Sequence, residues 1–138
     1  MSGREGGQTT VLMLGLSLVC FAVAGVAVDG TRAFLLRRTL QNAADSAALA
    51  GAGELDRTRY YSSAGRDVVL DPDGARRMAS EWLHRRGIRA AAAIAAERDA
   101  VNVALRDRLP TTFLNLIGVR SLPVAVEARA EPRFATPI

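Results

Sequence analysis

An uninterrupted apolar run near the amino terminus constrains this chain more than any other feature. The run VLMLGLSLVCFAVAGVAV, Val11–Val28, contains no charged residue, and Ser17 is its only polar side chain. As a helix rising about 1.5 Å per residue it would be about 27 Å long, close to the thickness of the hydrocarbon core of a bilayer. We therefore predict a transmembrane helix over residues 9–28, with a short cytoplasmic tail, residues 1–8, before it. Its anchor residues include Val11, Leu14, Leu18, Phe21 and Val28.

A cleaved signal peptide and a buried core helix are the two alternatives for this run. A signal peptide has a shorter apolar core, followed by a small-x-small cleavage site. The pattern Ala22-Val23-Ala24 lies inside the run and is followed by four more apolar residues. The length of the run and its charged flanks therefore favour a retained membrane anchor.

The charges on either side of the span do not determine its orientation. Arg4 and Glu5 precede it, whereas Arg32, Arg37 and Arg38 follow it. The positive-inside rule alone would place the carboxyl-terminal side in the cytoplasm. A short tail before a long downstream domain is, however, the usual layout of an exported, anchored protein, so both orientations stay open on charge alone.

The segment after the span, residues 29–53, predicts a helix that continues out of the membrane as a stem. It lacks proline and is rich in residues that favour helix. A four-three spacing defines a seam, large near the membrane and small beyond it: Asp29, Ala33, Leu36, Leu40, Ala43, Ala47 and Ala50. Small side chains let another backbone approach closely, either the chain's own head or another subunit. A plain spacer helix is the third possibility, because alanine alone favours helix.

Polar residues of the stem suggest local pairs. Gln41 and Asp45 are four residues apart, a spacing at which side chains on a helix meet. Asp29 is the best candidate for a specific role: it would cap the helix at the membrane or pair with Arg32 or with an arginine of a neighbouring subunit. An ordinary charge at the membrane interface is an equal alternative for Asp29.

The remainder predicts a loop over residues 54–72, a small α+β head over 73–131 and a tail over 132–138. The sequence Asp71-Pro72-Asp73-Gly74 is typical of a turn and helix start, and a helix over 75–86 should follow, ended by Gly87. Its inward-facing residues should be Met78, Trp82 and Leu83.

Alternating apolar residues predict strands in the second half of the head. Residues 88–96 and 101–109 should form a hairpin with its turn near 97–100, although residues 90–93 could instead extend the preceding helix. Residues 111–118 predict a short apolar helix capped by threonine, and 124–130 a last strand. The fold class is thus α+β: a long helix and a small head of about three strands and one or two short helices.

The composition argues against nucleic-acid binding and against catalysis. All eighteen basic residues are arginine, they are spread among acids, and aromatics make up only 5%. A nucleic-acid interface would concentrate them and add stacking aromatics. His84 has no nucleophile beside it, and one histidine with one cysteine, Cys20, cannot build an ordinary zinc site. Asp71 and Asp73 fit a turn better than a calcium loop. We expect no enzyme, no cofactor, no metal and no small-molecule substrate.

Three motifs carry a family resemblance. They are Gly7-Gln8 before the span, Val28-Asp29-Gly30-x-Arg32 at its end, and LQNAADSAALA over residues 40–50. Together they resemble the TadE/TadG-like proteins of Flp (tight-adherence) pilus assembly. The resemblance marks a helix-packing signature: Asp29, Arg32, Leu36, Leu40, Gln41, Asn42, Ala43, Asp45, Ala47 and Ala50.

The resemblance implies a pilin-like plan and a non-enzymatic role as a minor pilin or accessory protein in Flp pilus assembly or related type II/IV secretion. It implies a single-pass protein of the cytoplasmic membrane with an extracytoplasmic head, whose partners are the lipid bilayer and other pilin-like or pilus-assembly proteins. Cleaved prepilins usually carry glutamate five positions after the cleavage glycine, whereas Gln8 follows Gly3 at that distance, which favours an uncleaved TadG-like chain. The alternative function is a stand-alone single-pass envelope protein with a small extracytoplasmic binding module.

Overall fold

The structure is a computed structural model of the 138-residue chain, and it describes residues 5–132. The chain divides into two compact units, each built from two separate segments. The first comprises Met1–Leu35 and Arg108–Leu122, and the second comprises Leu36–Asp107 and Pro123–Ile138. Most of the two predicted tails, residues 1–8 and 132–138, lies outside the described residues.

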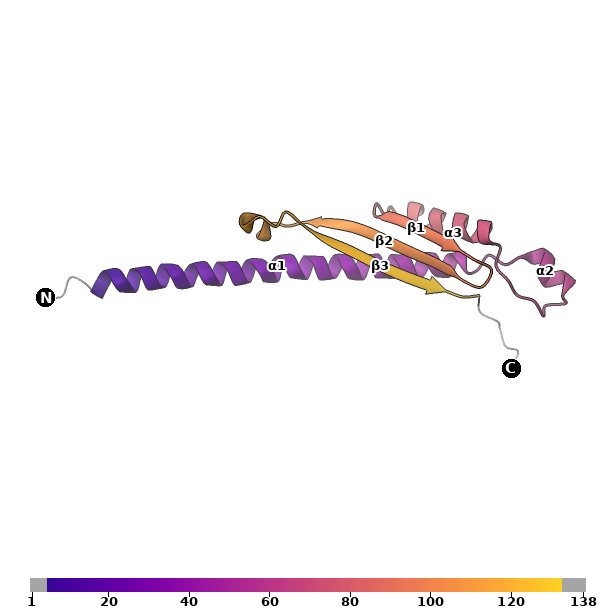
Figure 1. Cartoon of the computed structure of the whole chain (residues 1–138), viewed down its shortest axis with the longest axis horizontal. Helices are drawn as coiled ribbons and strands as arrows, with labels where there is room; N and C mark the ends of the chain where they lie inside the picture. Colours follow the sequence, from indigo (N-terminus) through magenta and orange to yellow (C-terminus); the bar gives the residue numbers. More distant parts are fainter. Residues whose placement is uncertain (1–4, 133–138) are drawn as a thin grey trace. The chain divides into compact units, whose positions relative to one another are not determined.

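The apolar run of the first unit is helical, as predicted. Helix α1, Glu5–Gly51, contains the predicted span and the predicted stem up to Gly51, two residues short of the predicted end, and it passes Gly30 without a break (Figure 1). Of the helices within residues 5–132, α1 is the one long and apolar enough to cross a membrane by length and composition. Its predicted anchor side chains are exposed, from 72% for Leu14 to 44% for Val28. Within residues 5–132 these side chains thus stay largely uncovered, as expected for side chains that face lipid.

The first unit also contains the 111–120 loop, which joins strands β2, Val101–Pro110, and β3, Ser121–Ala130. Its helical turn is a 3-10 helix, η1, over Leu114–Ile117. The predicted threonine cap is wrong: Phe113 stands at the N-cap position, with no side-chain cap hydrogen bond. The Thr111 hydroxyl instead donates to the carbonyl of Val119 and closes the base of the loop.

In the second unit, the described strands form a sheet in the order β1-β2-β3. The predicted hairpin is confirmed: β1, Ala91–Ala96, pairs antiparallel with β2, and Ala96 lies opposite Val101. Residues 91–93 are therefore strand and not an extension of the helix. The turn is closed by the Glu97 N–H, which donates to the carbonyl of Ala100 at 2.9 Å.

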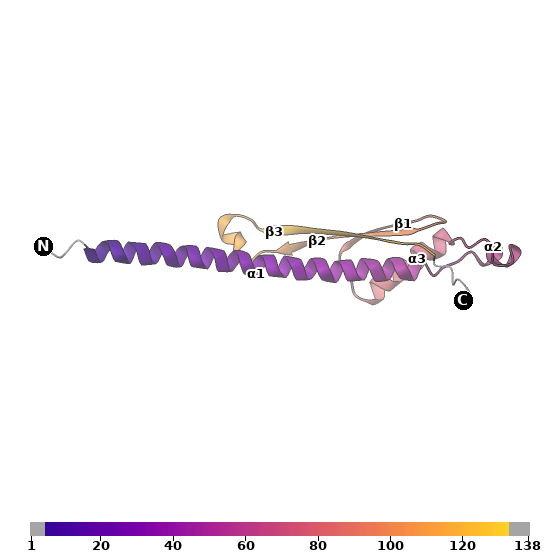
Figure 2. The same cartoon turned by 90° about the horizontal axis from the view of Figure 1, so that it is seen from below.

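The core of the second unit lies between one face of this sheet and two helices. Successive strand residues point to opposite faces, so Val101, Val103 and Leu105 of β2 are buried while the residues between them are more exposed. The carboxyl-terminal part of α1 lies along the sheet in both views (Figures 1 and 2). The core also contains residues of α1, α3 and β3: Leu40, Ala43, Ala44, Ala47, Ala48, Ala75, Ala79, Leu83, Val124, Val126 and Ala128.

Two further helices belong to the second unit. The predicted connection over residues 54–72 contains one short helix, α2, Arg57–Ser62. Helix α3, Pro72–Arg85, begins earlier than predicted because Asp71 caps it and Pro72 occupies its first turn. The predicted inward face is confirmed for Leu83, which is buried, and for Trp82, which is half-buried and packs against the core. It is incomplete, because Met78 is only half-buried and the prediction left out Ala75 and Ala79, which are fully buried.

Small residues form the α3 contact because the helices approach closely there. A Cβ atom at Gly51 of α1 would lie 2.9 Å from the carbonyl oxygen of Ala75. Trp82 is half-buried and packs against the edge of this core, and Met78 is also half-buried. Gly87 ends α3 in a left-handed conformation with φ of 67°, as predicted.

Candidate functional site

The carboxylate of Asp29 holds the 111–120 loop against helix α1. One carboxylate oxygen, Oδ1, accepts a hydrogen bond from the Thr112 N–H at 3.0 Å. The other, Oδ2, accepts from Phe113 at 2.9 Å and from Leu114 at 2.8 Å. These N–H groups precede or begin η1, where no earlier helical turn supplies carbonyl acceptors. Asp29 therefore caps a short helix that lies more than eighty residues away in sequence.

Arg32 completes this arrangement, which we call the Asp29 clamp and define as Asp29, Arg32 and the backbone of residues 112–114. The Arg32 guanidinium lies 3.5 Å from Asp29 Oδ1 and donates to the Thr112 hydroxyl at 2.7 Å. Its spacing of three residues from Asp29 puts both side chains on the same side of α1. The predicted pairing of Asp29 with Arg32 is therefore present.

Burial and hydrogen bonding make Asp29 electrostatically unusual. Its side chain has 0% exposure, whereas that of Arg32 is 42% exposed. The pKa of Asp29, which lies just outside the predicted span, is lowered from its ordinary value of 3.8, mainly by the hydrogen bond from the Leu114 N–H and next by that from Thr112. Burial opposes this change, while Phe113 and the charge of Arg32 add to it. The clamp is built for an ionised carboxylate.

A glycine of α1 allows the 111–120 loop to pack closely against the helix. Gly25 is buried, four residues before Asp29 and hence on the same side of the helix. A Cβ atom at position 25 would lie 2.6 Å from the Cβ of Phe113. Only a residue without a side chain leaves room for Phe113 at this distance.

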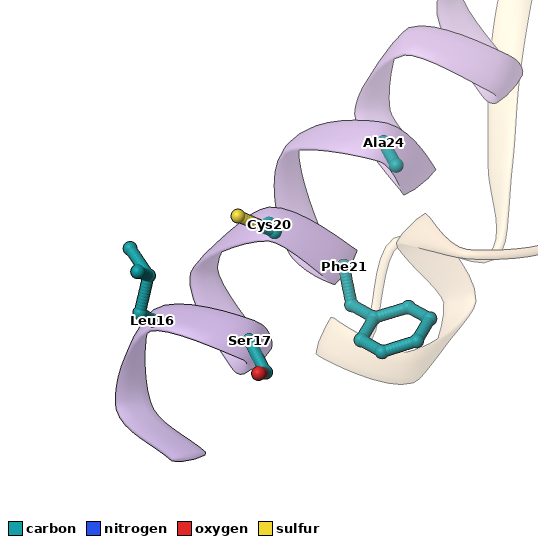
Figure 3. A pocket seen from close by; sticks show the side chains of 5 residues that line it. All are labelled: Leu16, Ser17, Cys20, Phe21 and Ala24. Carbon is teal, nitrogen blue, oxygen red and sulfur yellow. The ribbon is translucent and has the colours of Figure 1, made fainter. Parts of the chain in front are cut away.

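Beyond the clamp, the loop and the predicted span line an apolar groove of about 330 Å³. The helix contributes Leu18, Phe21, Ala22 and Val26, and the loop contributes Phe113, Leu114, Leu116 and Ile117. Figure 3 shows the Phe21 side chain directed toward the ribbon that carries η1, whereas Leu16 and Cys20 point away from it. Leu116 and Ile117 are 83% and 75% exposed.

The predicted stem seam packs on the chain's own head. Leu40, Ala43 and Ala47 are buried in the core of the second unit, and Leu36 is packed against it. The chain's own head, and not another subunit, therefore packs against the seam at Leu40, Ala43 and Ala47. The Gln41–Asp45 pair is present at 3.0 Å, and the Gln41 amide also donates to the carbonyl of Glu127 at 3.1 Å.

Two exposed members of the helix-packing signature, Asn42 and Asp45, lie on another face of α1. We call this face the outer stem face and define it by four exposed residues at helical spacing: Arg38, Asn42, Asp45 and Leu49. A groove of about 490 Å³ adjoins it, lined by Asp45, Leu49, Arg129, Ala130 and Glu131.

The other residues singled out in the sequence do not gather into a site. His84 is exposed near the end of α3, and Asp71 accepts from the Asp73 N–H at 3.2 Å as a helix cap. Cys20 lines a shallow depression of about 400 Å³ on the predicted span, without charged neighbours. Within residues 5–132, no three His, Cys, Asp or Glu side chains lie together as a metal site would require.

The clamp could not be assembled from sequence, although both of its halves carry signals. Asp29 directly follows an apolar run, and Thr111-Thr112 is typical of the start of a helix. Nothing in the spacing relates two segments so far apart. The sequence signal that points to the clamp is an acid directly after an apolar span, because such a group needs hydrogen-bond donors when it is buried.

These features define the class of the protein: an α+β chain with one long apolar amino-terminal helix and a head of three antiparallel strands and short helices. The amino-terminal helix region, residues 7–54, matches the family model Tad, "Putative Flp pilus-assembly TadE/G-like", which confirms the resemblance. The match spans less than half of the chain and includes Gly25, Asp29 and Arg32, and the matched family is not one of enzymes. No curated protein and no solved structure matches the chain.

Proposed function

We propose that this chain is a non-enzymatic, pilin-like minor pilin or accessory protein of Flp (tight-adherence) pilus assembly or a related type II/IV secretion system. It is anchored by a single helix in the cytoplasmic membrane and carries an extracytoplasmic head. The observation that carries the proposal is the family match over residues 7–54, because that segment includes the membrane span and the stem in one continuous helix.

The change in side-chain exposure along α1 supports a membrane anchor in its amino-terminal part. Side chains of the predicted span are exposed to the surroundings, as in Leu14 at 72% and Phe21 at 71%. Further along, Ala44 and Ala47 have 0% exposure because strands of the head cover them. An exposed apolar stretch of this length is costly in water and favourable in lipid, so the same helix serves as anchor and as part of the head core.

The surface for pilin-like partners is, in this proposal, the outer stem face. The seam residues Leu40, Ala43 and Ala47 are engaged with the head and are not accessible to another subunit. Asn42 and Asp45 belong to the same family signature, yet they are exposed, and Leu49 beside them is 61% exposed. An apolar side chain within a polar rim is a common composition for a protein interface.

Crosslinking in native membranes tests both the system and the surface. A photoreactive residue at Leu49 should capture pilin-like or pilus-assembly proteins, and the native chain should copurify with them in mild detergent. The matched control is the same residue at Ala125, which is exposed on the open face of the sheet. A strictly monomeric chain without pilus components would contradict the proposal and favour a stand-alone envelope protein.

Topology and processing are separate parts of the proposal and have their own tests. In spheroplasts, external protease should cut the head, including the exposed residues around Trp82, while the membrane stays sealed. Protection of the head until lysis would contradict an extracytoplasmic location. Mass spectrometry of the mature amino terminus should find an uncleaved chain, because the position five residues after Gly3 is Gln8.

A further inference from the structure

We propose that the 111–120 loop is a second membrane-inserting element, which buries Phe113, Leu116 and Ile117 among the acyl chains of the leaflet next to the head. This inference goes beyond the proposed function but rests on its membrane anchor. The occupant of the apolar groove is lipid, and the loop lies beside the helix as a wedge without crossing the bilayer.

The first argument is the position of the groove on the span. Its helix-side residues Phe21 and Val26 lie within the run predicted to occupy the hydrocarbon, about two turns and one turn before Asp29. At about 5.4 Å per turn, the loop extends roughly 12 Å from the level of Asp29 toward the amino terminus of α1. This depth lies within one leaflet of a hydrocarbon core about 30 Å thick. If lipid surrounds this part of α1, it also surrounds the loop.

The second argument is the composition of the loop surface. Leu116 and Ile117 are the most exposed large apolar residues outside α1 among those described, apart from Tyr61. Between Phe113 and Val119 the only polar side chain is Asn115. A contiguous exposed apolar patch of this kind is unfavourable in water and marks a surface that another apolar phase covers.

The third argument is that most N–H groups at the tip of the loop have hydrogen-bond acceptors. Non-helical backbone is costly in hydrocarbon unless its N–H and C=O groups have partners. The Asp29 carboxylate accepts the N–H groups of residues 112, 113 and 114. Carbonyls within the loop accept those of Leu116, Gly118 and Val119 at 3.0–3.1 Å. The clamp thus gives an acceptor to the N–H groups at the start of η1, which would otherwise need water as their hydrogen-bond partner.

The arginines at the base of the loop agree with insertion of its apolar tip into one leaflet. Arg32 lies one turn beyond the predicted span, and Arg120 closes the other end of the loop, where its carbonyl accepts the Thr111 N–H at 3.1 Å. Both arginine side chains are exposed. Arginines at this level can reach lipid phosphates while the apolar tip lies deeper.

Spin labelling of the full-length chain tests the insertion. Cys20 is the only cysteine, so Cys20→Ser provides a background for single labels. Labels at Leu116→Cys and, separately, Ile117→Cys replace exposed side chains and should leave the fold intact. The chain is reconstituted in phosphatidylcholine/phosphatidylglycerol vesicles, and each label is exposed to oxygen, which partitions into lipid, and to a nickel chelate, which stays in water.

Two reference labels calibrate the result. Leu14→Cys reports on the lipid-facing span, and Ala125→Cys reports on the water-facing sheet. We expect Leu116 and Ile117 labels to resemble the Leu14 label, with a clear shift from nickel to oxygen accessibility relative to Ala125. If they resemble the Ala125 label while Leu14 remains in lipid, the loop insertion is wrong and the anchor stands. If the Leu14 label is also in water, the anchor fails, and the insertion fails with it.

Protein–protein contact is the remaining alternative and would also overturn the inference. A label buried against a second copy of this chain would be shielded from both reagents, and the shielding would decrease as the protein is diluted with lipid. Lipid insertion predicts accessibility that does not change with dilution.

Discussion

Gly25 of α1 and Phe113 of the 111–120 loop approach so closely that a Cβ atom at position 25 would lie 2.6 Å from the Phe113 Cβ. The opposing atom is the first atom of the side chain, so rotation of the phenyl ring cannot relieve the contact. Any larger residue at position 25 must therefore move the backbone of the loop or of the helix.

Gly25→Ala should lift the loop from the helix. Overpacking of this kind costs about 1–3 kcal/mol, so the population of the open loop should rise between about fivefold and about 150-fold. Hydrogen exchange of the Thr112, Phe113 and Leu114 amides in detergent measures it. Gly15→Ala is the matched control, because nothing lies within 4 Å of that position, and it should be neutral or slightly stabilising. Equal amide protection in both variants would contradict the close packing of Phe113 on Gly25.

Asp29→Asn should weaken the clamp without changing its size. An amide offers one acceptor oxygen in place of two and loses the charge that attracts Arg32, so some of the N–H groups of residues 112–114 lose their partner. Exchange of these amides should accelerate, and the effect should be confined to the loop. The control is Asp45→Asn, because Asp45 is exposed and its hydrogen bond from Gln41 can be kept by an amide oxygen.

Acid should release the loop in the same way. The folded pKa of Asp29 is lowered below 3.8, chiefly by the Leu114 and Thr112 N–H groups, so its contribution to stability is present above that value. It is lost as the pH falls from about 3.8 through the lower folded pKa. The amide signals of residues 112–114 in an NMR titration should move together in that window. Signals that move only near neutral pH would contradict this assignment.

Ala47→Leu should destabilise the head, because the seam is already filled by the chain's own core. Ala47 has 0% exposure, and inserting larger side chains into a packed core costs about 1–3 kcal/mol. Denaturant unfolding followed by Trp82 fluorescence measures the change. Ala125→Leu, on the open face of the sheet, should stay within about 0.5 kcal/mol. A stable Ala47→Leu variant that fails only in partner assembly would instead support an intersubunit seam.

Leu105→Ala should be more severe than any change on the surface. Leu105 has 0% exposure in the centre of β2, and truncations of buried leucine cost about 2–5 kcal/mol. The same unfolding measurement applies. Leu49→Ala is the control, because that side chain is 61% exposed and its removal leaves no cavity.

Local patterns were sufficient to predict most of the elements. The apolar run predicted the amino-terminal part of α1, and alternation over residues 101–109 predicted β2, since both depend on neighbours in sequence. Asp71-Pro72 predicted a helix start, but the bounds of α3 and its inward face were less accurate. Large apolar side chains such as Trp82 indicate the side of α3 that faces the core, but the pattern does not predict that Ala75 and Ala79 are the fully buried residues, because only the distance between two helices decides which size of residue fits.

The sequence by itself determined that this chain has a long apolar helix, a stem of small residues and an α+β head, because hydrophobic periodicity and turn residues act over short stretches of chain. Tertiary structure alone decided what the stem packs against and why Asp29 is buried. A carboxylate finds its hydrogen-bond donors in space, and the donors of Asp29 come from a loop more than eighty residues further along the chain.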